Sequence, residues 1–330
     1  MEKQRNYLQS VKNEVDILPI EEEFLSSTKR VIENKLGHEI RLCKKYEVHP
    51  IYDSYLIAGN DRPFLLKVNL SPDTPNSWDL LSKNNYDFHP KIICSSNDSD
   101  EFKFICFEVP KGMFLSDISN YPLSRKLKLQ DTFLRDLKQM HSIKIKDEDE
   151  TVKIFDSFLP REAMMVAKKY PVIQLFSTAK MVFKKIYKPD QQDCGLCHFD
   201  LCPENIIYTG TDIKFINFEY SANANIYLDI LLAKETLNCS NQTFEEICHI
   251  LPKDTYDKLL LNKDASNLFN FAYFNSKITS EYITFGLRNP VKLKYWINKS
   301  ELFYNKIFDK LFVEKQLDKL IRDFYYLWKS

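Results

Sequence analysis

An aspartate and an asparagine five positions apart carry the clearest chemical signal in this sequence. Asp200 is suited to accept the proton of an attacking hydroxyl group, and Asn205 is suited to hold a metal ion through its amide oxygen. Pro203 lies between them and stiffens the connecting loop by fixing its own φ angle. Phosphoryl transfer depends mainly on alignment and on neutralising phosphate charge, so a base and a metal ligand on one tight loop suit that reaction.

The residues around this pair support the same interpretation. His198, Asp200 and Asn205 together have the spacing of a kinase catalytic loop, and apolar runs flank the loop on both sides. We expect His198 to support the loop rather than to do chemistry. Twelve residues after Asn205, Asn217 stands where a phosphotransferase normally places a metal-binding aspartate. A polar turn without chemistry is the weaker interpretation of this combination.

The elements that must position these residues change character near residue 110. We expect an α+β, protein-kinase-like fold of two lobes: a small antiparallel β-rich lobe at 1–110 and a larger, mainly helical lobe at 111–330. The sequence predicts helices over 21–36, 75–85, 127–141 and 317–328, and strands near 40–48, 53–58, 63–69, 92–93, 102–109, 206–208 and 213–216.

Composition narrows the class of protein. The chain has 330 residues with 46 basic and 46 acidic side chains, so bulk charge does not favour binding to nucleic acid. It contains no apolar run long enough to predict a membrane span and no signal-peptide pattern near its start. We therefore expect a cytoplasmic protein whose eight cysteines are reduced thiols.

The stretch "GLCHFDLCPENIIYTGTDIKFINFEYS" resembles the catalytic region of the aminoglycoside phosphotransferase and choline/ethanolamine kinase superfamily. The resemblance extends over about 40–240, but only 195–220 is specific. Within it, "FEY" at 218–220 is closer to the choline/ethanolamine branch. The resemblance implies a protein-kinase-like fold and the phosphorylation of a small-molecule hydroxyl group with ATP and Mg²⁺. An amino-alcohol such as choline or ethanolamine is the favoured acceptor.

The resemblance also implies roles for individual residues. Asp200 corresponds to the catalytic base, Asn205 and position 217 to the two magnesium ligands, and Lys67 to the strand lysine that binds the α and β phosphates. Lys67 also fits an edge strand that keeps its charge in solvent.

Two further roles concern the nucleotide. The backbone around Glu108 and Val109 corresponds to the segment that meets the adenine. The chain has no glutamate between 48 and 100, so we expect an aspartate to pair with Lys67, and Asp79 is the best candidate. A solvated Asp79 on a helix surface is an equally good interpretation.

The sequence departs from the family pattern in the phosphate-binding region and at the metal ligand. Asn217 keeps an oxygen donor but lacks the negative charge that magnesium prefers. Three explanations are open for an asparagine at this position. The protein is a natural pseudokinase, the asparagine is an introduced substitution, or Glu219 compensates for the missing charge. In addition, 41–57 contains no glycine, which makes close approach of the backbone to phosphate harder.

Other functions compete with the amino-alcohol kinase. A pseudokinase that binds a partner or a nucleotide and an aminoglycoside kinase both fit the loop, whereas "CGLCH" at 194–198 is a weak match to a haem attachment site. Aromatic residues are frequent over 269–304 and could surround a quaternary ammonium group, but helix packing is the better interpretation for each one. The sequence leaves the oligomeric state open.

Overall fold

The computed structural model describes residues 30–37, 39–40, 42–49, 52–58, 63–68, 81, 84, 86–96, 104–115, 123–144, 148–158, 172–188, 190–237, 253–285 and 290–311. The chain forms two compact units. Unit 1 comprises Met1–Ile143 and Leu201–Glu219, and unit 2 comprises Lys144–Asp200 and Tyr220–Ser330. The predicted lobe boundary near residue 110 stays a prediction.

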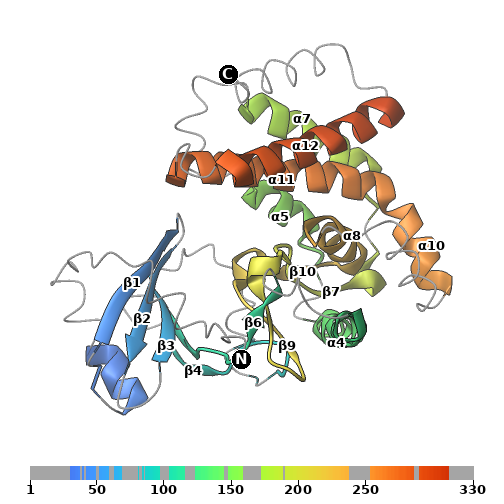
Figure 1. The fold of residues 1–330 in the computed structure, drawn as a ribbon. Helices are drawn as coiled ribbons and strands as arrows, with labels where there is room; N and C mark the ends of the chain where they lie inside the picture. The colour runs from blue at the N-terminus through green and yellow to red at the C-terminus, as the bar shows by residue number, and fades with distance from the viewer. Residues whose placement is uncertain are drawn as a thin grey trace. The chain divides into compact units, whose positions relative to one another are not determined.

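A five-stranded antiparallel sheet dominates the first part of unit 1, with the order β1-β2-β3-β5-β4 (Figure 1). Its central strand, β3, is an almost continuous apolar run, as expected for a strand that is covered on both faces. The strands are β1 (Leu42–His49), β2 (Tyr52–Ala58), β3 (Pro63–Val68), β4 (Ile92–Ser95) and β5 (Phe104–Glu108). The sequence predicted all five, to within a few residues. The expected helix over 75–85 lies largely outside the described residues.

The two faces of β3 have different neighbours. Phe64, Leu66 and Val68 alternate along the strand and join one hydrophobic cluster, together with Ile32 of the helical segment 30–36. That segment ends at Gly37, whose φ of 72° suits the position that follows a helix. Because successive side chains point to opposite faces, Lys67 points away from this cluster.

Unit 1 also contains a three-stranded sheet with the order β6-β8-β9. Its strands are β6 (Met113–Phe114), β8 (Ile206–Tyr208) and β9 (Ile213–Phe215), and α4 (Leu123–His141) packs on β9. The Asp136 carboxylate of α4 accepts the backbone N–H of Ile213 at 2.9 Å. Gly112 precedes β6 at a close approach, where a Cβ atom would lie 2.6 Å from the carbonyl oxygen of Tyr208. Only glycine fits there.

Unit 2 is mainly helical. Its helices are α5 (Thr151–Ser157), α7 (Val172–Ile186), α8 (Ile226–Thr236), α10 (Lys253–Leu261), α11 (Lys263–Phe285) and α12 (Pro290–Leu311), with the strand pair β7 (Cys194–Cys197) and β10 (Ala222–Asn225). The long helix α11 packs against each of the other five (Figure 1). The expected terminal helix over 317–328 lies outside the described residues.

Aromatic side chains build the core of unit 2. Phe269 and Phe274 of α11 are fully buried, and the rings of Phe274 and Phe303 stack with centroids 5.6 Å apart. Helix packing is therefore confirmed as the role of these residues. No helix in the described part of the chain is both long enough and apolar enough to cross a membrane.

Candidate active site

The sequence-predicted site residues fall into two groups, one in each unit. Lys67, Asn205 and Asn217 belong to unit 1, and Asp200 belongs to unit 2. The chain passes from unit 2 to unit 1 between Asp200 and Leu201.

Lys67 lies at the centre of the first group. Its Nζ atom donates to Oδ1 of Asn217 at 2.7 Å and forms an ion pair with Glu219. The lysine and glutamate side chains are only 1% and 5% exposed. An unpaired charge at this depth would be very unfavourable, so the lysine and the carboxylate stabilise each other here.

This ion pair corrects one sequence-based expectation. A glutamate from far along the chain pairs with Lys67, so the inference that any ion pair of Lys67 must use an aspartate is wrong. The inference failed because it considered only residues near Lys67 in sequence, whereas Glu219 is 152 positions away. Asp79 lies outside the described residues.

Asn217 connects Lys67 to the catalytic-loop asparagine. Because a lysine can only donate, the amide oxygen of Asn217 must face Lys67, and its NH₂ group donates to Oδ1 of Asn205 at 2.7 Å. The backbone of Asn217 has a φ of 66°, a left-handed conformation that asparagine tolerates better than most residues. Both ends of its amide are thus engaged within unit 1.

The short helix Pro203–Asn205 fixes the other end of this contact. Pro203 is at its first position, where the missing N–H is no loss, and the N–H of Asn205 donates to the carbonyl of Cys202 at 2.9 Å. The carbonyl of Asn205 accepts the N–H of Ile216 at 3.0 Å. The backbone therefore holds Asn205 next to the segment that carries Asn217.

These residues do not fit a magnesium ion in this arrangement. Magnesium requires oxygen ligands, usually with one or two carboxylates, but the oxygen of Asn205 accepts a hydrogen bond from the amide of Asn217. The oxygen of Asn217 accepts from Lys67, and the nearby carboxylate of Glu219 is paired with the same lysine. The amide oxygens of Asn205 and Asn217 thus already accept hydrogen bonds from groups of the chain.

Asp200 is the centre of the second group. It is 6% exposed, and its Oδ1 atom accepts hydrogen bonds from the hydroxyl of Tyr273 and, at 2.8 Å, from Nζ of Lys277. Its backbone N–H donates to Nδ1 of His198 at 3.2 Å, which agrees with a supporting role for that histidine. A buried carboxylate with one oxygen fixed by two donors is well positioned to act as a proton acceptor.

The loop before Asp200 is strained and firmly held. Phe199 has a φ of 56°, which is unfavourable for a bulky side chain. The buried carboxylate of Asp229, in the first turn of α8, accepts the N–H groups of His198 at 2.9 Å and Phe199 at 2.8 Å. The ring of Phe199 is buried against that of Phe269, with centroids 4.9 Å apart. Asp229 therefore positions the loop that presents Asp200.

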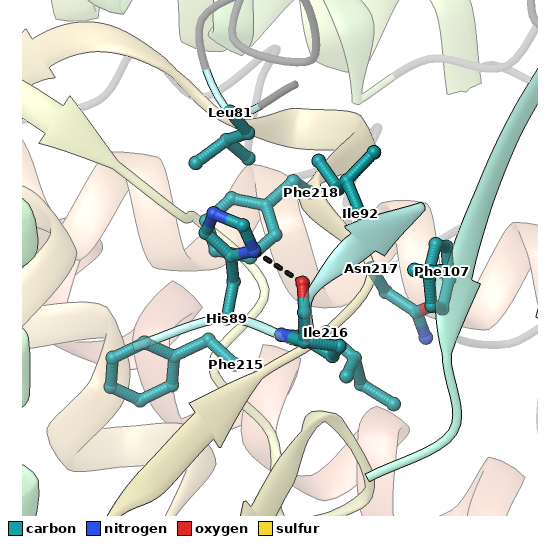
Figure 2. Close-up of a pocket in the computed structure, with 9 residues that line it drawn as sticks. Leu81, His89, Ile92, Phe107, Phe215, Ile216, Asn217 and Phe218 are labelled. Atoms are coloured by element: carbon teal, nitrogen blue, oxygen red, sulfur yellow. Dashed lines mark hydrogen bonds between the residues drawn. The ribbon is translucent and has the colours of Figure 1, made fainter. Parts of the chain in front are cut away.

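A small cavity of about 10 Å³ lies beside Asn217 and Phe218 in unit 1 (Figure 2). This is room for about one water molecule and too little for an organic ligand. His89 lines the cavity and donates from Nδ1 to the carbonyl of Pro90. Burial lowers the pKa of His89, so the ring is held neutral.

The segment expected to meet an adenine is the end of β5. The N–H of Glu108 donates to the carbonyl of Lys91 at 2.9 Å, and both Glu108 and Val109 are half-buried. A role for these two residues in nucleotide binding stays a prediction.

Sequence reasoning missed three residues that shape the site: Tyr273, Lys277 and Asp229. The first two lie one helical turn apart on α11, so they share a face, but nothing in the sequence connects that face to Asp200. The position of Asp229, four residues after the N-cap Asn225 and in the first turn of a helix, was the available signal.

Comparison with solved structures identifies the architecture. The chain resembles spectinomycin phosphotransferase APH(9)-Ia, solved with ADP and spectinomycin, with a TM-score of 0.52 and 12% identity over 84% of this chain and 97% of that chain. It is also similar to an ethanolamine kinase from Plasmodium vivax, with a TM-score of 0.51 and 15% identity over 87% of this chain and 90% of that chain. Choline kinase LicA from Streptococcus pneumoniae is similar too, with a TM-score of 0.52 and 15% identity over 86% of this chain and 99% of that chain. The fold is that of the small-molecule kinases.

The comparisons leave the branch open. Aminoglycoside, choline/ethanolamine and fructosamine kinases all occur among the similar structures, each with 15% identity or less. No family model matches the sequence, and no curated protein matches it. The likeness therefore fixes the fold and leaves the acceptor to be determined.

Proposed function

We propose that this protein is an ATP-dependent phosphotransferase that acts on a hydroxyl group of a small molecule. In this proposal Lys67 binds the phosphates of ATP, and Asp200 accepts the proton of the attacking hydroxyl group. The observation that carries the proposal is the contact of Lys67, a buried strand lysine, with position 217, which is 150 positions away. This contact brings the cation of Lys67 beside the segment that follows the predicted catalytic loop, which supports a role for Lys67 at the phosphates.

The nucleotide side of the proposal uses residues of unit 1. The backbone at Glu108 and Val109 is proposed to meet the adenine. Spectinomycin phosphotransferase, which has this fold, was solved with ADP, and this supports a nucleotide as the donor. Asn205 and Asn217 remain the predicted magnesium ligands, but we assign no reaction step to magnesium because of their mutual hydrogen bond.

Two classes of acceptor are supported by the sequence and by the similar structures. The sequence "FEY" at 218–220 favours an amino-alcohol such as choline or ethanolamine, and the similar solved structures include kinases of both. An aminoglycoside is the alternative, supported by the similar aminoglycoside phosphotransferases.

A second candidate function is a pseudokinase that binds a nucleotide or a partner without catalysis. The observation that favours it is the amide of Asn217, whose NH₂ group faces the oxygen of Asn205. A hydrogen-bond donor at this place opposes a cation electrostatically.

One experiment separates the two candidates. The experiment uses three proteins: wild type, Asn217→Asp and the double variant Asn217→Asp/Asp200→Asn. Their unfolding temperatures are measured with ATP, with and without Mg²⁺. Their release of ADP is then assayed with choline, ethanolamine, aminoglycosides and neutral sugars. We expect wild type to be stabilised by ATP with little dependence on Mg²⁺ and to turn over slowly, and Asn217→Asp to gain both a Mg²⁺-dependent shift and faster turnover. Replacing Asp200 as well should keep binding but reduce turnover about 10²- to 10⁴-fold.

The outcomes are distinct. If Asn217→Asp binds ATP but phosphorylates no acceptor, the pseudokinase replaces the enzyme as the best function. If ATP stabilises none of the three proteins, both candidates are rejected.

A further inference from the structure

The ammonium group of Lys277 occupies a position next to Asp200 in unit 2. Lys277 lies one turn after Tyr273 on α11, and its Nζ atom is 2.8 Å from Oδ1 of Asp200. The hydroxyl of Tyr273 donates to the same oxygen. The lysine side chain is 23% exposed, so the pair is accessible to solvent on the lysine side.

Two aromatic rings complete the surroundings of this ammonium group. Nζ of Lys277 lies 5.3 Å from the ring centroid of Tyr273 and 5.6 Å from that of Tyr220. Both distances are within the range of cation–π attraction. A carboxylate together with two aromatic faces is the set of groups that recognises an ammonium ligand, and here the chain supplies the ammonium itself.

We propose that Lys277 is a built-in cation that determines the charge of the acceptor. This inference rests on the proposed function, in which the reacting hydroxyl group approaches Asp200. The charges of Lys277 and Asp200 cancel, so the pair favours an uncharged polyhydroxyl acceptor, such as a sugar or a polyol. An amino-alcohol would bring a second cation close to Lys277, and we expect this repulsion to weaken its binding about 100-fold.

The proposal revises the preference drawn from the sequence. The "FEY" element suggested an amino-alcohol, but only its Tyr220 lies in unit 2, whereas Phe218 and Glu219 belong to unit 1. Lys277 contributes directly to the charge around Asp200, because its Nζ atom and the Tyr273 hydroxyl contact the same oxygen atom of Asp200.

Binding of a small ammonium ion tests the proposal without ATP. Tetramethylammonium chloride is titrated into wild type, Lys277→Ala and Lys277→Arg by calorimetry, with potassium chloride as the reference salt. Lys277→Ala removes the internal cation and opens its site, whereas Lys277→Arg keeps the charge. Lys263→Ala is the matched control, since Lys263 is an exposed lysine at the start of the same helix.

We expect Lys277→Ala to bind tetramethylammonium at least about tenfold more tightly than the other three proteins, because it alone has lost the positive charge at position 277. In the acceptor assay, we expect neutral sugars to exceed choline by at least about tenfold in kcat/KM, and Lys277→Ala to shift the preference towards choline. Thermal unfolding and the near-ultraviolet circular dichroism spectrum check that each variant is folded.

Two results would overturn the proposal: no ammonium binding by folded Lys277→Ala, or equal binding by wild type. Choline as the best acceptor of the protein with Lys277 intact would do the same. A failure of the proposed function has a different signature, since it removes the response to ATP but leaves the ammonium titration unchanged.

Discussion

Each unit contains a lysine paired with a buried carboxylate, and the two pairs differ in their access to water. The side chains of Lys67 and Glu219 in unit 1 are 1% and 5% exposed, and those of Lys277 and Asp200 in unit 2 are 23% and 8% exposed. The first lysine also donates to the amide of Asn217, whereas the second lies near two tyrosine rings. The chemistry of the pairs is the same, and only their surroundings differ.

The difference separates an architectural pair from an exchangeable one. When both charges are buried from solvent, removing one leaves the other without an opposite charge nearby, so the pair is expected to hold its segments together. When water reaches the lysine, a ligand can replace part of its surroundings at a smaller cost. We therefore expect the pair in unit 1 to contribute more to stability than the pair in unit 2, and the pair in unit 2 to affect recognition of the acceptor.

The largest expected effect concerns the dry pair. Replacing Lys67 with methionine keeps the aliphatic stem but leaves the Glu219 carboxylate buried and unpaired, which should destabilise the protein by about 3–5 kcal/mol. Urea unfolding measures this loss. The double variant Lys67→Met/Glu219→Gln should lose clearly less than the sum of the two single variants. A cost below about 1 kcal/mol for Lys67→Met would contradict the architectural role.

The more open pair should give a smaller effect. Lys277→Met is expected to destabilise the protein by only about 1–2 kcal/mol, because Asp200 keeps the hydrogen bond from Tyr273. Part of this loss should disappear in concentrated salt, which screens an exposed charge more than a dry one. Lys263→Met serves as the control in the same urea titrations. The comparison fails if Lys277→Met is as costly as Lys67→Met.

The smallest expected effect is a pH dependence of the free energy of unfolding, which arises from the buried His89 of unit 1. Burial lowers the pKa of His89 below its ordinary value of 6.5, so the unfolded chain binds this proton more readily than the folded one. The corresponding stability is present above pH 6.5 and is lost as the pH falls through the folded pKa. Urea unfolding of wild type and His89→Gln between pH 5 and 8 should show a steeper acid loss for wild type. Parallel curves would mean that His89 does not titrate in this way.

Local patterns in the sequence were sufficient for most of the fold. The apolar run of β3, the glycine at 37 and the short strands after Asn205 each depend on neighbouring residues, and their predicted positions agree with the structure to within a few residues. The fold class also followed from the order of these elements and is confirmed by the similar solved structures.

The site was less predictable because its contacts join distant segments. Asp200, Asn205 and Asn217 could be named from their spacing, but the partners of Lys67 and Asp200 lie 152 and 73 positions away. Spacing along one helix or loop does not report which face meets another element. This is why Glu219 was considered only as a substitute metal ligand, and why Lys277 was not considered at all.

The path of the chain through the two units limits how the protein can be divided. Unit 1 takes its last segment, Leu201–Glu219, from the middle of the sequence that otherwise forms unit 2. A fragment that stops at Ile143 lacks β8, β9 and both asparagines, so β6 loses its partner strand. Neither half is available as a contiguous piece, and binding studies on either unit require the whole polypeptide.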